Sequence, residues 1–334
     1  MQVTVVRPAD LGEVEAVQWR SFQDSSLMMS HPFFSLSYVK AWGMVNANAR
    51  VTVVEDNGRI EAFIPYEIGD GRIATAIGGT HTYVDGIVSA GAPLEIRAII
   101  KKSGLRGWRF TRAPEGQKVL DPYRYHGAND HRLASYVDLS KGYDSYLSDL
   151  RDGVKKRIAK TEKSRRSLQR AAGSVSFDWR NSKSEYFDQL IGWKSAQYEN
   201  VRDWNAKALP VIRELILADN DDCRGLVSVL FAGEQAAAVT LCLEGPSIVA
   251  GWIMGFNPEF SRFSVGTAQL LDLIRGSAEH GIKMLDLGAD YTATTDNYKD
   301  RFGNATYEVG GGGVWTSRLG AAARSLYRTV KYRD

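Results

Sequence analysis

One order of secondary-structure elements is predicted twice along this chain, and this repetition constrains the fold more than any other feature. Each copy consists of a β-hairpin, a third strand, a loop, a helix and a last strand. The first copy contains the clearest turn of the chain, Asp56-Asn57-Gly58, because Asn-Gly accepts the positive φ angles of a tight hairpin. Its elements are predicted as hairpin 50–68, strand 72–77, loop 78–86, helix 93–103 and strand 108–112.

The second copy contains the same elements in the same order, namely hairpin 225–245, strand 247–254, loop 255–266, helix 267–280 and strand 282–287. The helix is predicted because Leu270, Leu271 and Ile274 recur on one face, and Gly281 follows its end. A length of 334 residues, 44% of them hydrophobic, suits two domains. We therefore predict an α/β (α+β) chain with domains at 1–140 and 141–334, although chance recurrence is the alternative.

Composition excludes several classes of function. The formal net charge is only +3, so the whole chain is not a nucleic-acid-binding polycation and no DNA partner is expected. Cys223 and Cys242 form neither a disulfide framework nor a CxxC pair, so we expect buried thiols and no metal site. HExxH, GxSxG and P-loop patterns are absent from the sequence.

The sequence shows no segment that would direct or anchor the chain in a membrane. Its start lacks the basic and apolar regions of a signal peptide. No run approaches the ~18 apolar residues of a spanning helix. We therefore expect a cytoplasmic protein without a transmembrane segment.

The loop before the second-copy helix can bind an anion. The first N–H groups of a helix have no intrahelical partner, and the helix dipole adds about half a positive charge there. Gly266 lets a phosphate approach the backbone, while Ser264 or Thr267 can cap the helix or donate to the ligand. Arg262 can pair with a phosphate oxygen. The alternative is a plain capped helix after a glycine-containing loop.

The last strand of the second copy contains Asp286 among apolar residues. An ionised carboxylate there must be paired or face a cleft at the strand end, so structural pairing and catalysis both remain open. Tyr298 and Lys299 follow a polar loop beyond this strand. That loop leaves the edge where open α/β sheets place their sites.

The middle of the chain is strongly basic. Residues 151–170 hold nine Lys or Arg and two acidic residues, and we predict a basic linking helix within 144–171. It is either a solvated linker or a patch for an anionic partner, such as CoA phosphates, a nucleotide-sugar, tRNA or a membrane surface. No aromatic residues interleave with the charges, as they would in a nucleic-acid groove. The basic stretch 317–334 either docks as a terminal helix or makes a peripheral membrane contact.

These motifs resemble a known family, the GNAT-superfamily acetyltransferase-like proteins associated with bacterial cellulose and exopolysaccharide biosynthesis. The similar residues of the second half are Ser264-x-Gly266, Glu279-His280-Gly281, Asp286-Leu287-Gly288 and Tyr298-Lys299 with Phe302. Those of the first half are His31-Pro32-Phe33-Phe34-Ser35 with Ala41-Trp42, and Tyr83-Val84-Asp85. Two positions depart from the pattern. Val265 stands where the family often has proline, and Phe263 takes the Gln/Arg position of the pyrophosphate signature, with Arg262 one residue early.

The resemblance implies two tandem GNAT-like domains related to Fem-type aminoacyltransferases. Each has a mixed, mostly antiparallel central sheet flanked by helices. It also implies an acyl-CoA-dependent N- or O-acyltransferase that uses acetyl-CoA or a longer acyl-CoA as co-substrate. A small-molecule or glycan acceptor then attacks the thioester directly. The alternatives are a Fem-type transferase that uses aminoacyl-tRNA and a non-catalytic GNAT-like scaffold of a polysaccharide synthesis complex.

The same resemblance suggests roles for individual residues. Strand 247–254, which contains Trp252, donates a backbone N–H to the thioester carbonyl, and such a donor contributes roughly 3 kcal/mol. Asp286 or Asp85 is the candidate base and Tyr298 the candidate acid. The expected substrate-binding residues are Tyr83, Trp193, Lys194 and Lys299.

Overall fold

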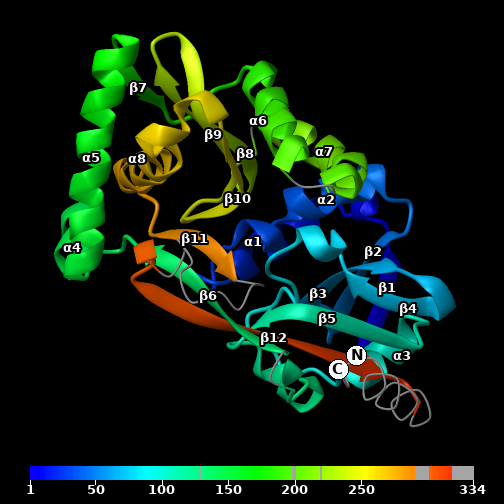
Figure 1. The fold of residues 1–334 in the computed structure, drawn as a ribbon. Helices are drawn as coiled ribbons and strands as arrows, with labels where there is room; N and C mark the ends of the chain where they lie inside the picture. Colours follow the sequence, from blue (N-terminus) through cyan, green and yellow to red (C-terminus); the bar gives the residue numbers. More distant parts are fainter. Residues whose placement is uncertain (128–129, 198–200, 219, 290–300, 318–334) are drawn as a thin grey trace. The chain divides into compact units, whose positions relative to one another are not determined.

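The computed structural model describes residues 1–127, 130–197, 201–218, 220–289 and 301–317 (Figure 1). Its contacts divide the chain into two compact units, which we describe separately. Unit 1 comprises Met1–Met29, Val39–Arg132 and Glu308–Asp334, and unit 2 comprises Ser30–Tyr38 and Leu133–Tyr307. Each unit therefore includes a segment from the other end of the chain. A simple boundary at residue 140 does not anticipate this exchange.

The sheet of unit 1 is built on the predicted hairpin. Strands β2 (Ala49–Asp56) and β3 (Arg59–Ile68) pair antiparallel, and Asn57 and Gly58 between them have φ angles of 49° and 74°. The other strands are β1 (Gln2–Val6), β4 (Ile73–Ala76), β5 (Gly107–Pro114) and β12 (Ala305–Trp315). Their order is β1-β2-β3-β4-β5-β12, in which β4 and β5 pair in parallel and the other neighbours antiparallel.

Helices cover both faces of this sheet. Trp19 and Phe22 of α1 (Glu13–Gln23) contact the ring of Phe63, with centroids 4.6 Å and 6.0 Å away. Helix α3 (Ile96–Lys102) is buried in one cluster with Ile64. Because Phe63 and Ile64 are neighbours on β3, they point to opposite faces, so α1 and α3 lie on opposite sides. Helix α2 (Leu36–Val45) begins in unit 2 and continues in unit 1.

The strands of unit 2 follow one another in the sheet in the order β6-β11-β10-β9-β8-β7. Its strands are β6 (His131–Asp138), β7 (Val175–Asp178), β8 (Arg224–Ala232), β9 (Gln235–Glu244), β10 (Ile248–Phe256) and β11 (Met284–Ala289). Strands β10 and β11 are parallel and the other neighbours antiparallel. Strands β6 and β12 each have residues in both units.

The helices of unit 2 lie on the two faces of β8–β10 (Figure 1). One side carries α4 (Tyr143–Asp149), α5 (Asp152–Ala172) and α8 (Val265–Glu279), and the other α6 (Ser184–Gln197) and α7 (Val201–Leu217). The predicted apolar stripe of Leu270, Leu271 and Ile274 is buried. The basic segment forms two helices because the backbone of Leu150 and Arg151 is extended between them. Short 3₁₀ helices are η1 (Pro8–Asp10), η2 (Pro32–Phe34), η3 (Asp70–Arg72), η4 (Gly79–His81), η5 (Lys118–Tyr123) and η6 (Pro258–Phe263).

The predicted repetition is confirmed. The sequence of elements β2-β3-β4-α3-β5 in unit 1 matches β8-β9-β10-α8-β11 in unit 2. In both copies the strand before the helix pairs in parallel with the strand after it, as a helical crossover requires. The fold is thus mixed α/β with mostly antiparallel sheets.

Both cysteines are free and buried. Burial raises the pKa of the Cys223 thiol and brings that of Cys242 to about 12. These thiols therefore stay protonated at neutral pH. Among the described residues, no helix has both the length and the apolar character to cross a bilayer.

Candidate functional site

The parallel strands β10 and β11 pair over three residues each and then part. Ile248, Val249 and Ala250 pair with Met284, Leu285 and Asp286, respectively. Each strand is irregular at this point, since β10 has an extra residue, Trp252, against β9, and β11 shifts its register against β6 after Asp286. Such bulges bend strands. We call the place where the two strands part, beyond Ala250 and Asp286, the fork.

Helix α8 begins beside the far end of β10. A Cβ atom on Gly266 would lie 3.5 Å from Cδ1 of Phe256 and 4.0 Å from Sδ of Met254. The N–H groups of Thr267 and Ala268 donate to the Ser264 carbonyl, at 3.0 Å and 3.1 Å. Within the described chain, the N–H groups of Val265 and Gly266 have no acceptor. Two backbone donors at the positive end of a 15-residue helix are therefore available to an anion.

The start of α8 differs from the prediction. The helix begins at Val265 instead of Thr267, so the Thr267 amide is used inside the first turn. Ser264 is left-handed, with φ 57° and ψ 37°, and its side chain forms no cap. A non-glycine residue in this conformation costs about 1–2 kcal/mol, and such strain clusters at ligand sites. Arg262 is exposed, with its guanidinium 4.7 Å from the Phe263 ring centroid.

Asp286, the candidate base, lies in a buried network at the fork. Its Oδ2 accepts a hydrogen bond from the Tyr307 hydroxyl and lies near Nε2 of His31, both at 3.0 Å. Its Oδ1 accepts from the Gly288 N–H at 2.8 Å. His31, Asp286 and Tyr307 are 0%, 1% and 7% exposed, so this carboxylate is both paired and buried. Burial, followed by the negative charge of Asp286, holds the pKa of Tyr307 well above its ordinary value.

The contacts of His31 identify its protonated nitrogen. The Phe33 backbone N–H, which can only donate, lies 3.3 Å from Nδ1. Nδ1 is therefore the acceptor, and the ring proton is on Nε2, where it is donated to Asp286. In the sequence, His31 belongs to an aromatic motif, and none of the motifs includes Tyr307. The sequence feature that could have pointed to both residues is Asp286, because a buried carboxylate needs hydrogen-bond donors.

Trp252 has a different environment from the one predicted. Its ring is buried and contacts Phe33 and Tyr38, at centroid distances of 5.7 Å and 6.3 Å. The ring is thus packed against aromatic side chains of segment 30–38, and the role of Trp252 in donor binding stays a prediction.

Asp85 and Tyr83 lie in unit 1, in the loop after β4. The Asp85 carboxylate accepts hydrogen bonds from the backbone N–H groups of Thr111 and Arg112, at 2.8 Å and 3.0 Å, and from the Thr111 hydroxyl at 2.9 Å. Burial raises its pKa, and these hydrogen bonds oppose the shift. The pair β4 and β5 also ends after three residues, at Arg109, and Asp85 holds the amides of Thr111 and Arg112 further along β5. These contacts favour a structural role for Asp85, and its catalytic role stays a prediction.

The remaining predicted residues are only partly placed. Trp193 and Lys194 are half-buried on α6, and a Cβ atom on Gly255 would lie 3.6 Å from the Trp193 ring. Gly255 and Met254 are neighbours on β10, so Trp193 is on the face opposite α8. Burial lowers the pKa of Lys194. Tyr298 and Lys299 lie outside the described residues.

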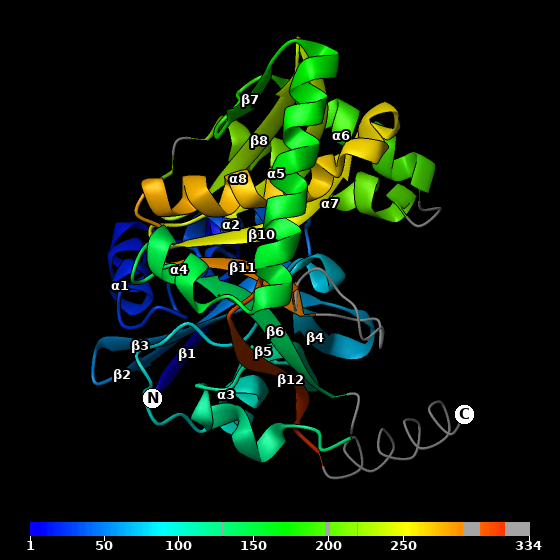
Figure 2. The ribbon, with the colours of Figure 1, turned by 60° about the vertical axis from the view of Figure 1, so that its left-hand side comes forward.

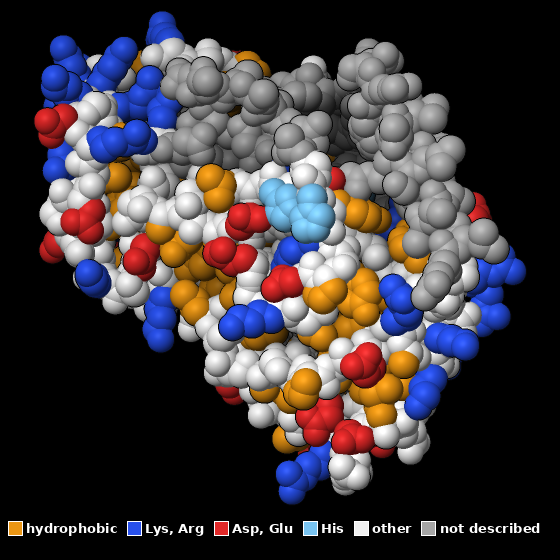
Figure 3. Space-filling model, turned by 90° about the horizontal axis from the view of Figure 1, so that it is seen from below, with side chains coloured by type: hydrophobic (Ala, Val, Ile, Leu, Met, Phe, Trp, Pro, Cys, Tyr) orange, Lys and Arg blue, Asp and Glu red, His pale blue; other side chains and the backbone are white. Residues whose placement is uncertain are grey.

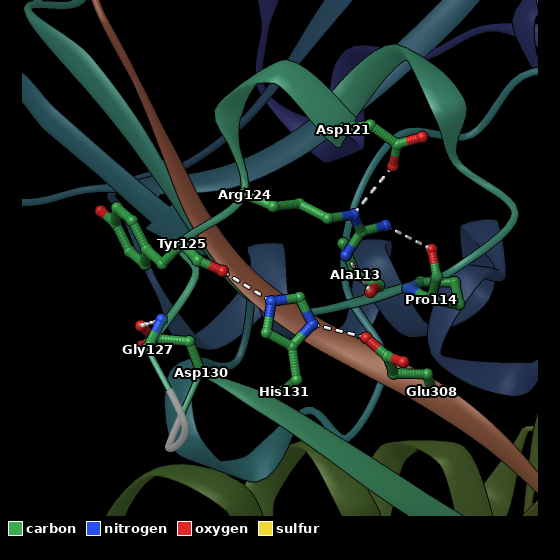
Figure 4. A network of polar contacts seen from close by, with 9 residues as sticks. All are labelled: Ala113, Pro114, Asp121, Arg124, Tyr125, Gly127, Asp130, His131 and Glu308. Carbon is green, nitrogen blue, oxygen red and sulfur yellow. Dashed lines mark hydrogen bonds and ion pairs between the residues drawn. The ribbon is translucent and has the colours of Figure 1, made fainter.

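A second polar network, in unit 1, joins β6 to β12 (Figure 4). Nδ1 of His131 lies 2.5 Å from Oε1 of Glu308, and Nε2 lies 2.6 Å from the Tyr125 carbonyl oxygen. Arg124 donates to the carbonyls of Ala113 and Pro114. Arg124 and His131 bond mainly to backbone carbonyl groups, and the His131–Glu308 contact joins two strands. We therefore interpret this network as structural.

Helix α5 carries a one-sided basic surface. Lys156, Lys160, Lys163, Arg166 and Arg170 are exposed, and their three- and four-residue spacing places them in one stripe, the basic face. The other side packs on α8 (Figure 2). There Arg165 donates to Asp272 at 2.6 Å. In Figure 3, Lys and Arg side chains gather at the upper left, on the side where α5 lies in Figure 1. Among described residues, none of the five forms a salt bridge.

Comparison with known proteins bears directly on unit 2. Residues 155–300 match the family model described as Acetyltransferase (GNAT) domain. A structure of FemX is similar with a TM-score of 0.60 and 8% identity, over 87% of this chain and 93% of that one. A conserved protein of unknown function from Bacteroides thetaiotaomicron has a TM-score of 0.58 and 9% identity, over 92% and 99%. No curated protein matches the chain.

A further structure decides the architecture. A tandem GNAT protein from the clavulanic acid biosynthesis pathway is similar with a TM-score of 0.52 and 10% identity, over 95% of this chain and 98% of that one. The chain has a tandem GNAT fold. At these identities the similarity concerns the fold alone. Within this tandem GNAT fold, the matched domain lies inside unit 2, which contains the fork and the start of α8.

Proposed function

We propose that the protein is an acyl-CoA-dependent N- or O-acyltransferase whose donor binds in unit 2. The observation that carries this proposal is the start of α8 beside the outer part of β10, where the Val265 and Gly266 amides have no acceptor among the residues that the structure describes. These amides would hold the diphosphate of CoA, with Arg262 as a further cation. The GNAT match over residues 155–300 supports the same donor.

The fork provides the second requirement of acyl transfer. In the proposed reaction an acceptor amine or hydroxyl attacks the thioester carbonyl and displaces the CoA thiolate. The acceptor proton passes to a base, and an acid protonates the thiolate. Beyond Ala250, β10 has no partner in β11 among the described residues, so its backbone can donate to the carbonyl oxygen. One such donor contributes about 3 kcal/mol to the transition state. Tyr298 remains the proposed acid.

The acceptor is proposed from the sequence motifs. Their resemblance to the exopolysaccharide-associated family supports a glycan, a sugar derivative or a related amine as the acceptor. Trp193, Lys194 and Lys299 are its proposed contacts. Trp193 and the lowered pKa of Lys194 favour a partly desolvated environment on the α6 side of β10.

The basic face of α5 is the proposed contact for an anionic partner. Its cations follow one another at three- and four-residue intervals, and like charges at these spacings each cost a helix about 0.2–0.5 kcal/mol. A bound polyanion would relieve this repulsion.

The donor is tested by calorimetric titration with acetyl-CoA and with a longer acyl-CoA. The transfer is tested by measuring the release of free CoA thiol in the presence of amino sugars and hydroxylated sugars. We expect binding and thiol release. Binding of aminoacyl-tRNA without binding of acyl-CoA would favour the Fem-type alternative. Binding of neither would favour the scaffold.

A further inference from the structure

We infer that His31 and Tyr307 are positioning residues, which fix the fork through Asp286 and thereby make segment 30–38 part of the donor site. The inference rests on the proposed function for its catalytic consequence. Its structural part, that the two side chains hold the fork in place, can be tested without any turnover.

Asp286 determines where β11 turns away. Its Oδ1 accepts the N–H of Gly288, two residues ahead in the same strand, at 2.8 Å. Gly288 has a φ angle of 75°, which favours glycine, and it lies in the register shift between Asp286 and Ala289. The side chain thus stabilises the irregularity at which β11 stops pairing with β10. Its orientation decides where the fork begins.

Two residues lock that orientation. The Nε2–H of His31 and the hydroxyl of Tyr307 both donate to Oδ2 of Asp286, at 3.0 Å. All three side chains are more than nine-tenths buried, so water does not replace a lost donor. His31 is held in turn by the Phe33 N–H at Nδ1 and by its stacking on the Phe33 ring, 5.3 Å between centroids. The carboxylate is therefore fixed from both sides.

Segment 30–38 also contacts the other strand of the fork. Phe33 meets the ring of Trp252 edge-on, with centroids 5.7 Å apart and planes at 88°. Trp252 is the extra residue of the β10 bulge. The segment itself is anchored at Ser37, whose N–H and hydroxyl donate to Asp222 at 3.0 Å and 2.5 Å. One short segment thus holds β11 through Asp286 and β10 through Trp252, and so sets their separation.

This arrangement predicts a specific kinetic signature. The diphosphate site at α8 does not include His31 or Tyr307, so donor affinity should survive their loss. The carbonyl-polarising backbone lies at the fork, so its displacement should lower kcat. Misplacement of a reacting group by about 1 Å can lower the rate about 10²-fold.

The experiment compares His31→Leu, His31→Gln, Tyr307→Phe and Tyr146→Phe. Gln retains an N–H group where Nε2 lies. Tyr146→Phe is the matched control, because Tyr146 is also buried and donates its hydroxyl to the Phe302 carbonyl at 2.9 Å, outside the fork. Thermal unfolding, the Kd of CoA and kcat are measured for each. We expect His31→Leu and Tyr307→Phe to lower kcat by about 10²-fold while the Kd changes less than about threefold. His31→Gln should recover most of kcat, and Tyr146→Phe should affect unfolding alone.

Two results would overturn the inference. One is a loss of kcat no larger than that of Tyr146→Phe, and the other is a parallel loss of CoA affinity and kcat. Hydrogen exchange of the backbone amides tests the lock without turnover. The amides of 248–254 and 284–289 should exchange faster in Tyr307→Phe than in wild type. Those of 224–244, outside the fork, should exchange at the same rate in both. Unchanged exchange in the fork strands would reject the lock. If the fork strands exchange faster in Tyr307→Phe as expected, but the wild-type protein binds no acyl-CoA, the proposed function is rejected and the lock is retained.

Discussion

Nε2 of His31 lies 3.0 Å from Oδ2 of Asp286, although 255 residues separate them in the sequence. The contact brings a residue from the first tenth of the chain to the end of a parallel strand pair in unit 2. The corresponding pair in unit 1, β4 and β5, also ends beside a buried aspartate, Asp85. There the carboxylate comes from a loop and occupies the amides beyond the pair. In unit 2 it comes from the strand itself, and among the described residues β10 pairs beyond Ala250 with β9 but not with β11.

Substitution Gly266→Asp should weaken CoA binding at least about tenfold, which corresponds to about 1.4 kcal/mol. A carboxylate in the first turn repels the diphosphate. Its interaction with the helix dipole stabilises the helix by about 0.3–1 kcal/mol, so the fold should be retained. Titration of the variant with CoA measures the change. The matched control is Gly153→Asp in the first turn of α5, where an added Cβ has no atom within 4 Å. Equal affinities of Gly266→Asp and wild type would exclude α8 as the diphosphate site.

Tyr307 should make the protein less stable in alkali. Burial and Asp286 hold its folded-state pKa well above the ordinary value, which is about 10 in an unfolded chain. Its contribution to stability is therefore complete below about pH 10 and is lost as the pH rises through the folded pKa. Urea unfolding between pH 8 and pH 11 should show a steeper decline for wild type than for Tyr307→Phe. Parallel declines would contradict the buried hydrogen bond to Asp286.

Substitution Asp85→Asn should destabilise unit 1 by about 1–3 kcal/mol, because the new NH₂ group faces a backbone donor and leaves it unsatisfied. Thermal unfolding measures this loss. The exposed Asp121, paired with Arg124 at 3.0 Å, is the control, and Asp121→Asn should change stability by less than about 0.5 kcal/mol. A large loss of kcat with unchanged stability would restore Asp85 as a catalytic base.

Charge reversal on the basic face should abolish binding of polyanions. The double variant Lys160→Glu and Lys163→Glu should bind anionic lipid vesicles and structured RNA at least about tenfold more weakly than wild type at low salt. The reason is that each Lys near an anionic surface contributes about 1 kcal/mol to binding. Co-sedimentation with vesicles and filter binding of RNA measure the two partners. The variant Lys101→Glu and Lys102→Glu, in α3, makes the same change in net charge and should bind as wild type does. If wild type binds neither probe, the basic face is a solvated surface.

Local chemistry made several elements predictable. The hairpin at Asn57-Gly58 and the apolar stripe of α8 follow from turn preference and helical period, and both are confirmed. The break at Leu150 and Arg151 was missed because two extended residues carry no Pro or Gly signal of their own. The start of α8 was placed late because Ser264 adopts a left-handed backbone that its side chain does not favour.

The contacts of the site were less predictable than its elements. Asp286 was recognised as a carboxylate that needs partners, but His31 and Tyr307 reach it only through tertiary folding. Trp252 lies on the predicted strand, yet its ring packs on segment 30–38, which no local pattern assigns to unit 2. Periodicity and turn chemistry report on neighbours in sequence, and these partners are distant in sequence.

The exchange of segments between the units has a consequence for synthesis on the ribosome. Unit 2 has all its residues once Tyr307 has emerged, because segment 30–38 has long been available. Unit 1 must wait for Glu308 and the residues after it, since β12 supplies the antiparallel partner of β5. Until then β5 presents an open edge, which invites pairing with other chains. The unit that is translated first is thus the last to be completed, and the nascent chain depends on β12 to close that edge.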